Sequence, residues 1–250
     1  VAAGINIFQP YVVSGEVPPP HQATLEDQFC LRFNDIENVG ITGSHYTGFI
    51  MIGHHVFNTP NKFLYFKNEG VEQFTNFFIK ALKVPKEKLV LHEDVWVGGG
   101  NFGPSIEFFA YGLELGNQVY MMFETRSVNN ALQVKDLKLK VLDMGMGHER
   151  NAWFSLGEVN SYEAVFPKTL AKLKALTGIQ ELFNNNKQVL TSFYSRAALL
   201  NKDESKLSFN QLVKDLSLTK EQESLILKLK ALYSIVEHAR ALLWLSLIHI

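Results

Sequence analysis

Short apolar runs bounded by turn-forming residues dominate the first part of the chain, and they predict β-strands. A polar, turn-rich loop at residues 34–40 separates the first two runs, which are therefore expected to form a long antiparallel hairpin. Residues 125–136 are polar and are expected to be an insertion or a turn. The expected strands cover residues 29–33, 46–57, 90–97, 106–110, 118–124 and 137–142, and residues 5–13 are also β-like.

Helical periodicity appears once among these strands and then dominates the rest of the chain. Thr219 and Gln222 have the spacing of a capping box, which predicts the start of a long helix with one apolar face. The expected helices cover residues 70–83, 162–176, 183–200 and 219–243.

Strands that precede helices predict an α+β fold, not an alternating α/β fold. We expect an antiparallel-sheet domain over residues 1–158 and a helical domain over residues 159–244. Val1 is not an initiator methionine, and residues 245–250 match the translation of a common sequencing adapter. We therefore expect a fragment that is truncated at both ends and carries an artefactual tail at 245–250.

Composition narrows the class of protein. The 250 residues carry a formal net charge of −1, so a contact with nucleic acid must rest on local patches. A single cysteine, Cys30, excludes a disulfide within the chain and fits a reducing compartment. No run of about 18 apolar residues is present for a membrane span. A cytoplasmic protein is expected.

The segment 141–154 carries the most informative motif. A β-type run delivers Asp143, and Gly145, Gly147, Glu149 and Arg150 follow as Gly-x-Gly-x-Glu-Arg before an apolar run. Glycines let the backbone approach a nucleotide, and an arginine offers a charged planar fork to phosphate. Taken alone, the motif is equally compatible with a glycine turn that is followed by an ion-paired Glu-Arg.

Three further segments resemble a known family. Residues 28–57 are similar to motif 2 of alanyl-tRNA synthetases, with an arginine strand, an Asn-Asp-Ile-Glu-Asn-Val-Gly loop and a following histidine-bearing strand. Residues 92–107 resemble the family's tryptophan and Gly-Pro segment, residues 113–123 its asparagine strand, and residues 141–150 its motif 3. The order of the segments also matches, and the similarity is greatest to the archaeal form. The resemblance implies a class II synthetase sheet flanked by helices, lacking motif 1, and then a helical domain that begins the tRNA-recognition region.

Site roles follow from this resemblance residue by residue. Arg32 and Arg150 match the arginines that bind ATP and act in catalysis, and Gly145 and Gly147 match the glycines of the ATP site. The resemblance also assigns an alanine pocket, in which Asp143 binds the alanine ammonium group and Trp96 and Asn117 line the pocket.

Other polar residues leave alternatives open. Glu107 is interpreted either as a ligand for magnesium or substrate, or as a turn cap. His54 and His55 are adjacent on a predicted strand and point to opposite faces, so they cannot share one metal, and packing is the favoured role. No zinc site is expected. Ser44 and Ile50 stand where the bacterial-type pattern has an arginine and a glutamate.

The resemblance implies ATP-dependent activation of alanine, with Mg²⁺, and transfer of alanine to the 3′ end of alanine tRNA. Editing is expected to lie outside this chain, and neither a homodimer of the full-length protein nor activity of the fragment alone is decided. Two other hypotheses stay open: a paralogue that activates an amino acid for another acceptor, and a non-catalytic tRNA-binding paralogue.

Overall fold

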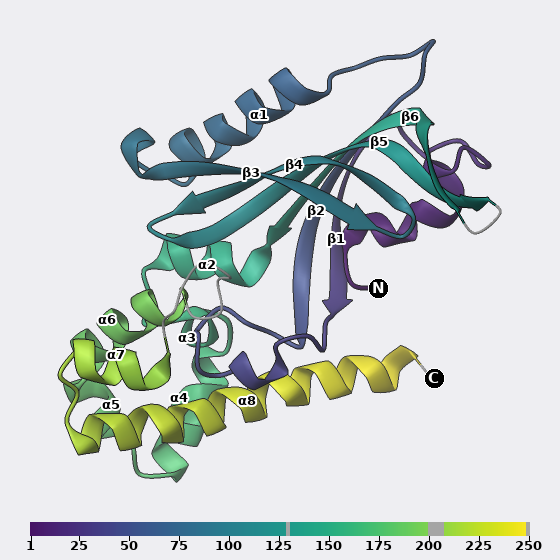
Figure 1. The fold of residues 1–250 in the computed structure, drawn as a ribbon. Coiled ribbons are helices and arrows are strands. Elements are labelled where there is room, and N and C mark those ends of the chain that lie inside the picture. Colours follow the sequence, from purple (N-terminus) through teal and green to yellow (C-terminus); the bar gives the residue numbers. More distant parts are fainter. Residues whose placement is uncertain (129–130, 200–207, 249–250) are drawn as a thin grey trace. The chain divides into compact units, whose positions relative to one another are not determined.

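The computed structural model describes residues 1–128, 131–199 and 208–248 (Figure 1). The chain divides into two compact units. Unit 1 comprises Val1–Cys30 and Ile50–Gly147, and unit 2 comprises Leu31–Phe49 and His148–Ile250. The domain boundary expected near residue 158 stays a prediction.

A six-stranded antiparallel sheet with the order β1-β2-β6-β5-β4-β3 forms the framework. The sheet and its flanking helices confirm the predicted α+β class. β1 and β2 are neighbours in the sheet, as the predicted hairpin of the first two strands requires. Chain order and sheet order differ because β6 is inserted between β2 and β5. The strands are β1 (Ala23–Leu31), β2 (Gly48–Asn58), β3 (Leu89–Gly98), β4 (Asn101–Ala110), β5 (Leu113–Val128) and β6 (Ala131–Gly147).

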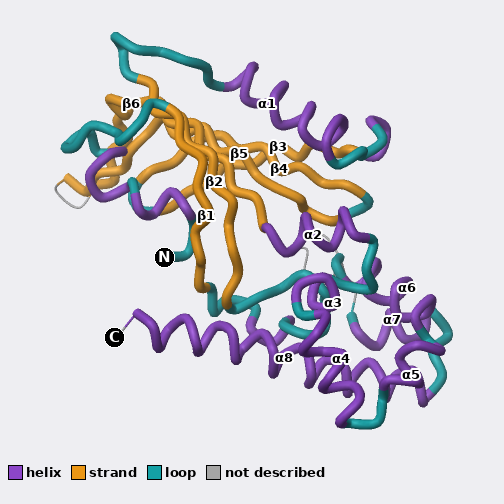
Figure 2. The backbone as a smooth tube through the Cα atoms, turned by 180° about the vertical axis from the view of Figure 1, so that it is seen from behind, coloured by secondary structure: helices purple, strands orange, loops and turns teal. Residues whose placement is uncertain are grey.

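Helix α1 (Lys67–Asn76), continued by the π-helical turn η4 (Phe77–Ala81), packs on one face of the sheet in unit 1 (Figure 2). The ring centroids of Phe74 and Phe108 lie 4.7 Å apart. At Gly70 an added Cβ would lie 2.5 Å from the Cδ1 atom of Leu142, so a larger residue would displace this buried side chain. The helix expected at 70–83 is thus present, beginning slightly earlier.

The opposite face of the sheet is covered at one end by two short helical turns, η1 (Gly4–Ile7) and η2 (Gln9–Val13). The β-like reading of residues 5–13 was wrong. Asn6 Oδ1 accepts hydrogen bonds from the backbone N–H groups of Ala2 and Ala3, which closes a turn, and Pro10 has no N–H to donate to a ladder. Ile5, Val12 and Val13 of this segment are buried against the sheet with Val119, Met121 and Val141.

The polar stretch 125–136 was also interpreted wrongly, because β5 and β6 continue into it and pair there as antiparallel strands. Glu124 lies opposite Lys135 in the register. Opposite charges across a ladder stabilise it without requiring a buried apolar face. The exposed residues 133–136 are therefore part of a solvated ladder.

Unit 2 is helical, and two of its expected helices are each divided in two. Pro167 begins a new helix after α3, because proline cannot donate the hydrogen bond that a continuous helix would need there. The capping box that begins α8 is confirmed: Thr219 N–H donates to Gln222 Oε1 at 3.0 Å and Gln222 N–H donates to Thr219 Oγ1 at 3.2 Å. The helices are α2 (His148–Leu156), α3 (Ser161–Val165), α4 (Pro167–Leu176), α5 (Gln180–Asn185), α6 (Lys187–Ala197), α7 (Phe209–Asp215) and α8 (Lys220–Ile248).

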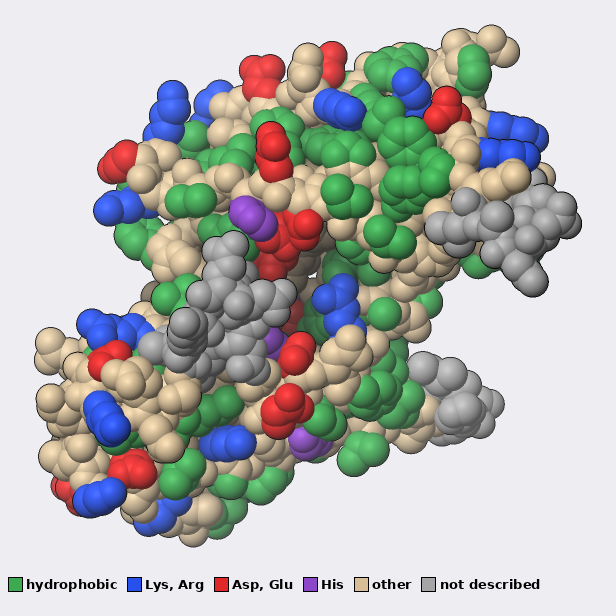
Figure 3. Space-filling view, in the orientation of Figure 1, with side chains coloured by type: hydrophobic (Ala, Val, Ile, Leu, Met, Phe, Trp, Pro, Cys, Tyr) green, Lys and Arg blue, Asp and Glu red, His purple; other side chains and the backbone are tan. Residues whose placement is uncertain are grey.

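Three tyrosines, Tyr162, Tyr194 and Tyr233, are fully buried in the core of unit 2. The Tyr233 hydroxyl donates to Glu163, which also pairs with the buried Lys174 at 2.7 Å. Acidic and basic side chains are interspersed over the face of unit 2 seen in Figure 3. Within the described ranges, no helix is both long enough and apolar enough to cross a membrane.

Gly103 provides a test of the β4–β5 register. A Cβ at this position would lie 1.9 Å from the backbone oxygen of Tyr120. We expect Gly103→Ala to lower the free energy of unfolding by about 3 kcal/mol or more, since the ladder must separate. Gly100 has a φ of +82° with nothing near the added atom, so Gly100→Ala should cost only about 1–2 kcal/mol. Denaturant unfolding measures both, and equal losses would contradict the register.

Candidate active site

The register of the sheet brings the predicted site residues of unit 1 onto one face. Asn117 of β5 lies opposite Gly145 of β6 on one side and Glu107 of β4 on the other. Asp143 is two residues from Gly145 along β6, and paired residues share a face, so all four side-chain positions point the same way. Trp96 of β3, paired with Gly103, belongs to this face too and packs against the core beneath η2.

Two glycines face each other in the neighbouring row. Gly53 of β2 lies opposite Gly145, and Met51 lies opposite Gly147 at the end of β6. A Cβ at Gly145 would come within 3.1 Å of the Met51 sulfur. The glycines of the Gly-x-Gly-x-Glu-Arg motif therefore lie at the end of a strand, and α2 begins immediately after them.

Asp143 is the most buried acidic group of this face, with 10% of its side chain exposed. Its Oδ1 atom lies 3.1 Å from Nδ1 of His55, which is fully buried and directly opposite on β2. The other ring nitrogen, Nε2, lies 3.1 Å from Glu26 Oε1 on β1. Burial alone would lower the pKa of His55, but the two carboxylates outweigh it and raise this pKa to about 9. The ring is therefore an imidazolium at neutral pH.

The remaining polar groups of this face are suited to a small ligand. Asn117 Oδ1 is buried and has no hydrogen-bond partner among the described residues. A buried acceptor without a donor is costly, so this atom favours a bound donor. Glu107 Oε2 lies 3.2 Å from His92 Nδ1, and its carboxylate is 23% exposed.

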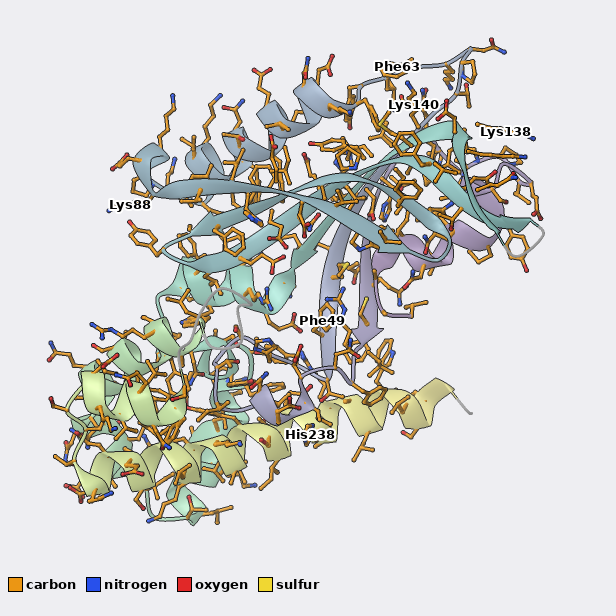
Figure 4. All side chains as sticks on the ribbon, in the orientation of Figure 1. Phe49, Phe63, Lys88, Lys138, Lys140 and His238 are labelled. Carbon is orange, nitrogen blue, oxygen red and sulfur yellow. The ribbon has the colours of Figure 1, made fainter. Side chains whose placement is uncertain are left out.

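In unit 2, Arg32 follows directly after β1. Its backbone N–H donates to the Thr47 carbonyl at 2.9 Å, which fixes the base of the motif 2 hairpin. The guanidinium lies 5.1 Å from the ring centroid of Phe49, which is a cation–π distance. Phe49 is labelled in Figure 4. This contact holds a permanently charged fork at the exposed end of the hairpin.

The motif 3 pair of unit 2 lies at the start of α2. Arg150 Nε donates to the Ser44 carbonyl at 3.2 Å. Glu149 is 2% exposed and pairs with Arg240 of α8 at 2.9 Å. Arg240 also donates to the Gly48 carbonyl at the start of β2.

A second side chain of helix α8, Glu237, also binds the backbone of Gly48. Glu237, fully buried, accepts a hydrogen bond from the Gly48 N–H at 2.7 Å and lies 2.7 Å from His238 Nδ1. Figure 4 labels His238 on this helix. The long helix thus holds the start of β2 and the motif 3 glutamate together within unit 2.

Sequence reasoning missed the roles of four of these groups: Glu26, His55, Glu237 and Arg240. The two from α8 stand on the long helix predicted over residues 219–243, where charged side chains beside the apolar face were an available signal. His54 and His55 do point apart: the His54 ring bonds to the Tyr65 hydroxyl at 2.8 Å. Among the residues that the structure describes, no three His, Cys, Asp or Glu side chains are grouped to hold a metal.

The chain belongs to the family described as tRNA synthetases class II (A), whose model matches residues 1–245. Among its relatives, the protein named Alanine--tRNA ligase of Methanocella arvoryzae is 51% identical over 247 residues, which is 97% of this chain and 27% of that protein. The proteins of the same name from Pyrococcus furiosus and Metallosphaera sedula are 36% and 42% identical, over 97% and 78% of this chain and 28% and 21% of their own lengths. The resemblance found in the motifs is confirmed, and the chain spans about a quarter of these relatives.

The charge of His55 can be measured directly. We expect ¹⁵N NMR of the imidazole groups to show His55 doubly protonated at about pH 7.5, because its pKa is raised to about 9. His54 should be neutral there, since burial and then the nearby charge of His55 lower its pKa. His55→Gln and His54→Gln assign the two signals. A His55 signal that titrates near its ordinary pKa of about 6.5 would contradict the ion pairs.

Proposed function

We propose that the protein containing this chain activates alanine with ATP and transfers it to alanine tRNA. The observation that carries the proposal is Asp143, a carboxylate held in place by His55 on the face that also bears Asn117 and Trp96. An ionised, oriented carboxylate is suited to an ammonium group. The relatives' printed name, Alanine--tRNA ligase, supports the same substrate.

In the first step, the alanine carboxylate attacks the α-phosphorus of ATP, forming alanyl-adenylate and releasing pyrophosphate. Asp143 binds the ammonium group of alanine, and the Asn117 amide and the Trp96 ring line the alanine pocket. Arg32 and Arg150 are assigned to the ATP phosphates and the charge that develops on them, on the strength of the motifs. Gly145 and Gly147 leave the backbone open to the nucleotide.

In the second step, a ribose hydroxyl at the tRNA 3′ end attacks the activated carbonyl carbon and AMP leaves. No protein nucleophile is required, so catalysis consists of positioning and electrostatic stabilisation. Glu107 is the carboxylate proposed for Mg²⁺ on this face. A magnesium ion held by one carboxylate and the substrate phosphates is an ordinary arrangement, and it would neutralise phosphate charge.

Removal of the Asp143 charge should affect alanine selectively. Charged hydrogen bonds contribute about 1.5–3 kcal/mol, so Asp143→Asn should reduce kcat/KM for alanine roughly a hundredfold in alanine-dependent ATP–pyrophosphate exchange by the complete protein. Asp136→Asn, an exposed aspartate on the same strand, is the matched control. No exchange with alanine in the unmodified protein would refute the proposal.

Arg32→Ala should abolish the same exchange without unfolding the protein, because the cation assigned to the α-phosphate is lost. Arg196→Ala removes an exposed arginine of α6 and should leave exchange unchanged. Exchange that survives Arg32→Ala would overturn this assignment, and charging of a different acceptor in place of alanine tRNA would favour a paralogue.

A further inference from the structure

Three charged groups form a buried line across unit 1, from β1 through β2 to β6. Glu26, His55 and Asp143 are joined by two contacts of 3.1 Å, with the imidazole in the middle and fully buried. The outer carboxylates are only 17% and 10% exposed. Ionised groups are rarely buried unless they pair, and one imidazolium here serves two carboxylates.

The surrounding residues are shaped to enclose this line. A Cβ at Gly53 would lie 2.7 Å from His55 Nε2, and a Cβ at Gly4 would lie 2.6 Å from Glu26 Oε1. The Phe8 ring packs edge-on against the imidazole at 5.1 Å. The charged groups that act on His55 are Glu26 from β1 and Asp143 from β6, and His54 is its titratable neighbour on the same strand.

We infer that His55 is a positioning residue for the alanine site: its imidazolium fixes the Asp143 carboxylate through Oδ1, so that Oδ2 is presented to the substrate ammonium group. This inference rests on the proposed function. It adds a group that does not touch the substrate but determines how well the substrate is held.

Charge balance explains why an imidazolium is needed. With His55 charged, the three groups sum to −1, which one ammonium neutralises. With a neutral residue in its place, two partly buried carboxylates would face each other with a sum of −2, and one of them would tend to take up a proton. A protonated or rotated Asp143 binds an ammonium group poorly. His55 therefore keeps Asp143 both ionised and aligned.

A kinetic comparison separates this role from a purely structural one. In the complete protein, His55→Gln should raise KM for alanine by about tenfold or more, while KM for ATP stays within about twofold. His54→Gln, the same change one residue away on the opposite face, should leave both values unaltered. Circular dichroism and thermal unfolding verify that each variant is folded. Equal rises in both KM values would indicate general damage and overturn the inference.

Glu26→Gln provides a second variant that keeps the shape of the outer partner. With one carboxylate gone, the pKa of His55 should fall, so the imidazolium is lost at lower pH. KM for alanine should then begin to rise at a lower pH in this variant than in the unmodified protein, where it should rise only near the raised pKa of about 9. Alanine itself loses its ammonium proton at high pH, but this affects both proteins equally and cancels when their pH profiles are compared.

The outcomes distinguish the two claims. If the unmodified protein shows no exchange with alanine, the proposed function fails and the inference fails with it. If exchange is normal and KM for alanine is unchanged in His55→Gln, or if the pH profile of Glu26→Gln matches that of the unmodified protein, only the inference fails.

Discussion

The cross-strand register of β2, β6, β5 and β4 is the constraint on which the site in unit 1 depends. Side chains alternate along each strand, so a slip of one residue in β6 would turn Asp143 to the face that packs on α1. The same slip would bury Asp143 among apolar side chains without His55. Gly70 on α1 packs closely against Leu142 of β6, and Gly103 on β4 packs closely against Tyr120 of β5. These close contacts favour the observed register.

In both units, buried charged side chains are paired with side chains of opposite charge. In unit 1, His55 lies between two carboxylates, and in unit 2 Glu149 pairs with Arg240 while Glu163 pairs with Lys174. Such pairs contribute little net stability, because desolvation offsets most of the attraction. Their value is geometric: each fixes one arrangement of strands or helices, since breaking one leaves a charge in a medium that cannot solvate it.

The sequence predicted the α+β class, most strands and the capping box at Thr219, because these depend on local patterns. It did not predict the turns at 5–13, where Asn6 and Pro10 outweigh a β-like apolar pattern. The site face was predicted only through family motifs. Glu26 and His55 are 29 residues apart, and no local pattern pairs them. Their contact follows from strand order, which composition and periodicity do not specify.

Ser44 departs from the bacterial-type pattern, but the contact that this position makes with Arg150 comes from its backbone and not from its side chain. Arg150 Nε donates to the backbone carbonyl of Ser44, which is 4% exposed, and every residue type has this acceptor. What the contact requires is the path of the backbone between Thr42 and Tyr46. That path is held by Tyr162, whose hydroxyl accepts from Gly40 N–H and donates to the carbonyl of His45. The orientation of Arg150 is therefore supported by the core of unit 2, through an acceptor that does not belong to the side chain at position 44.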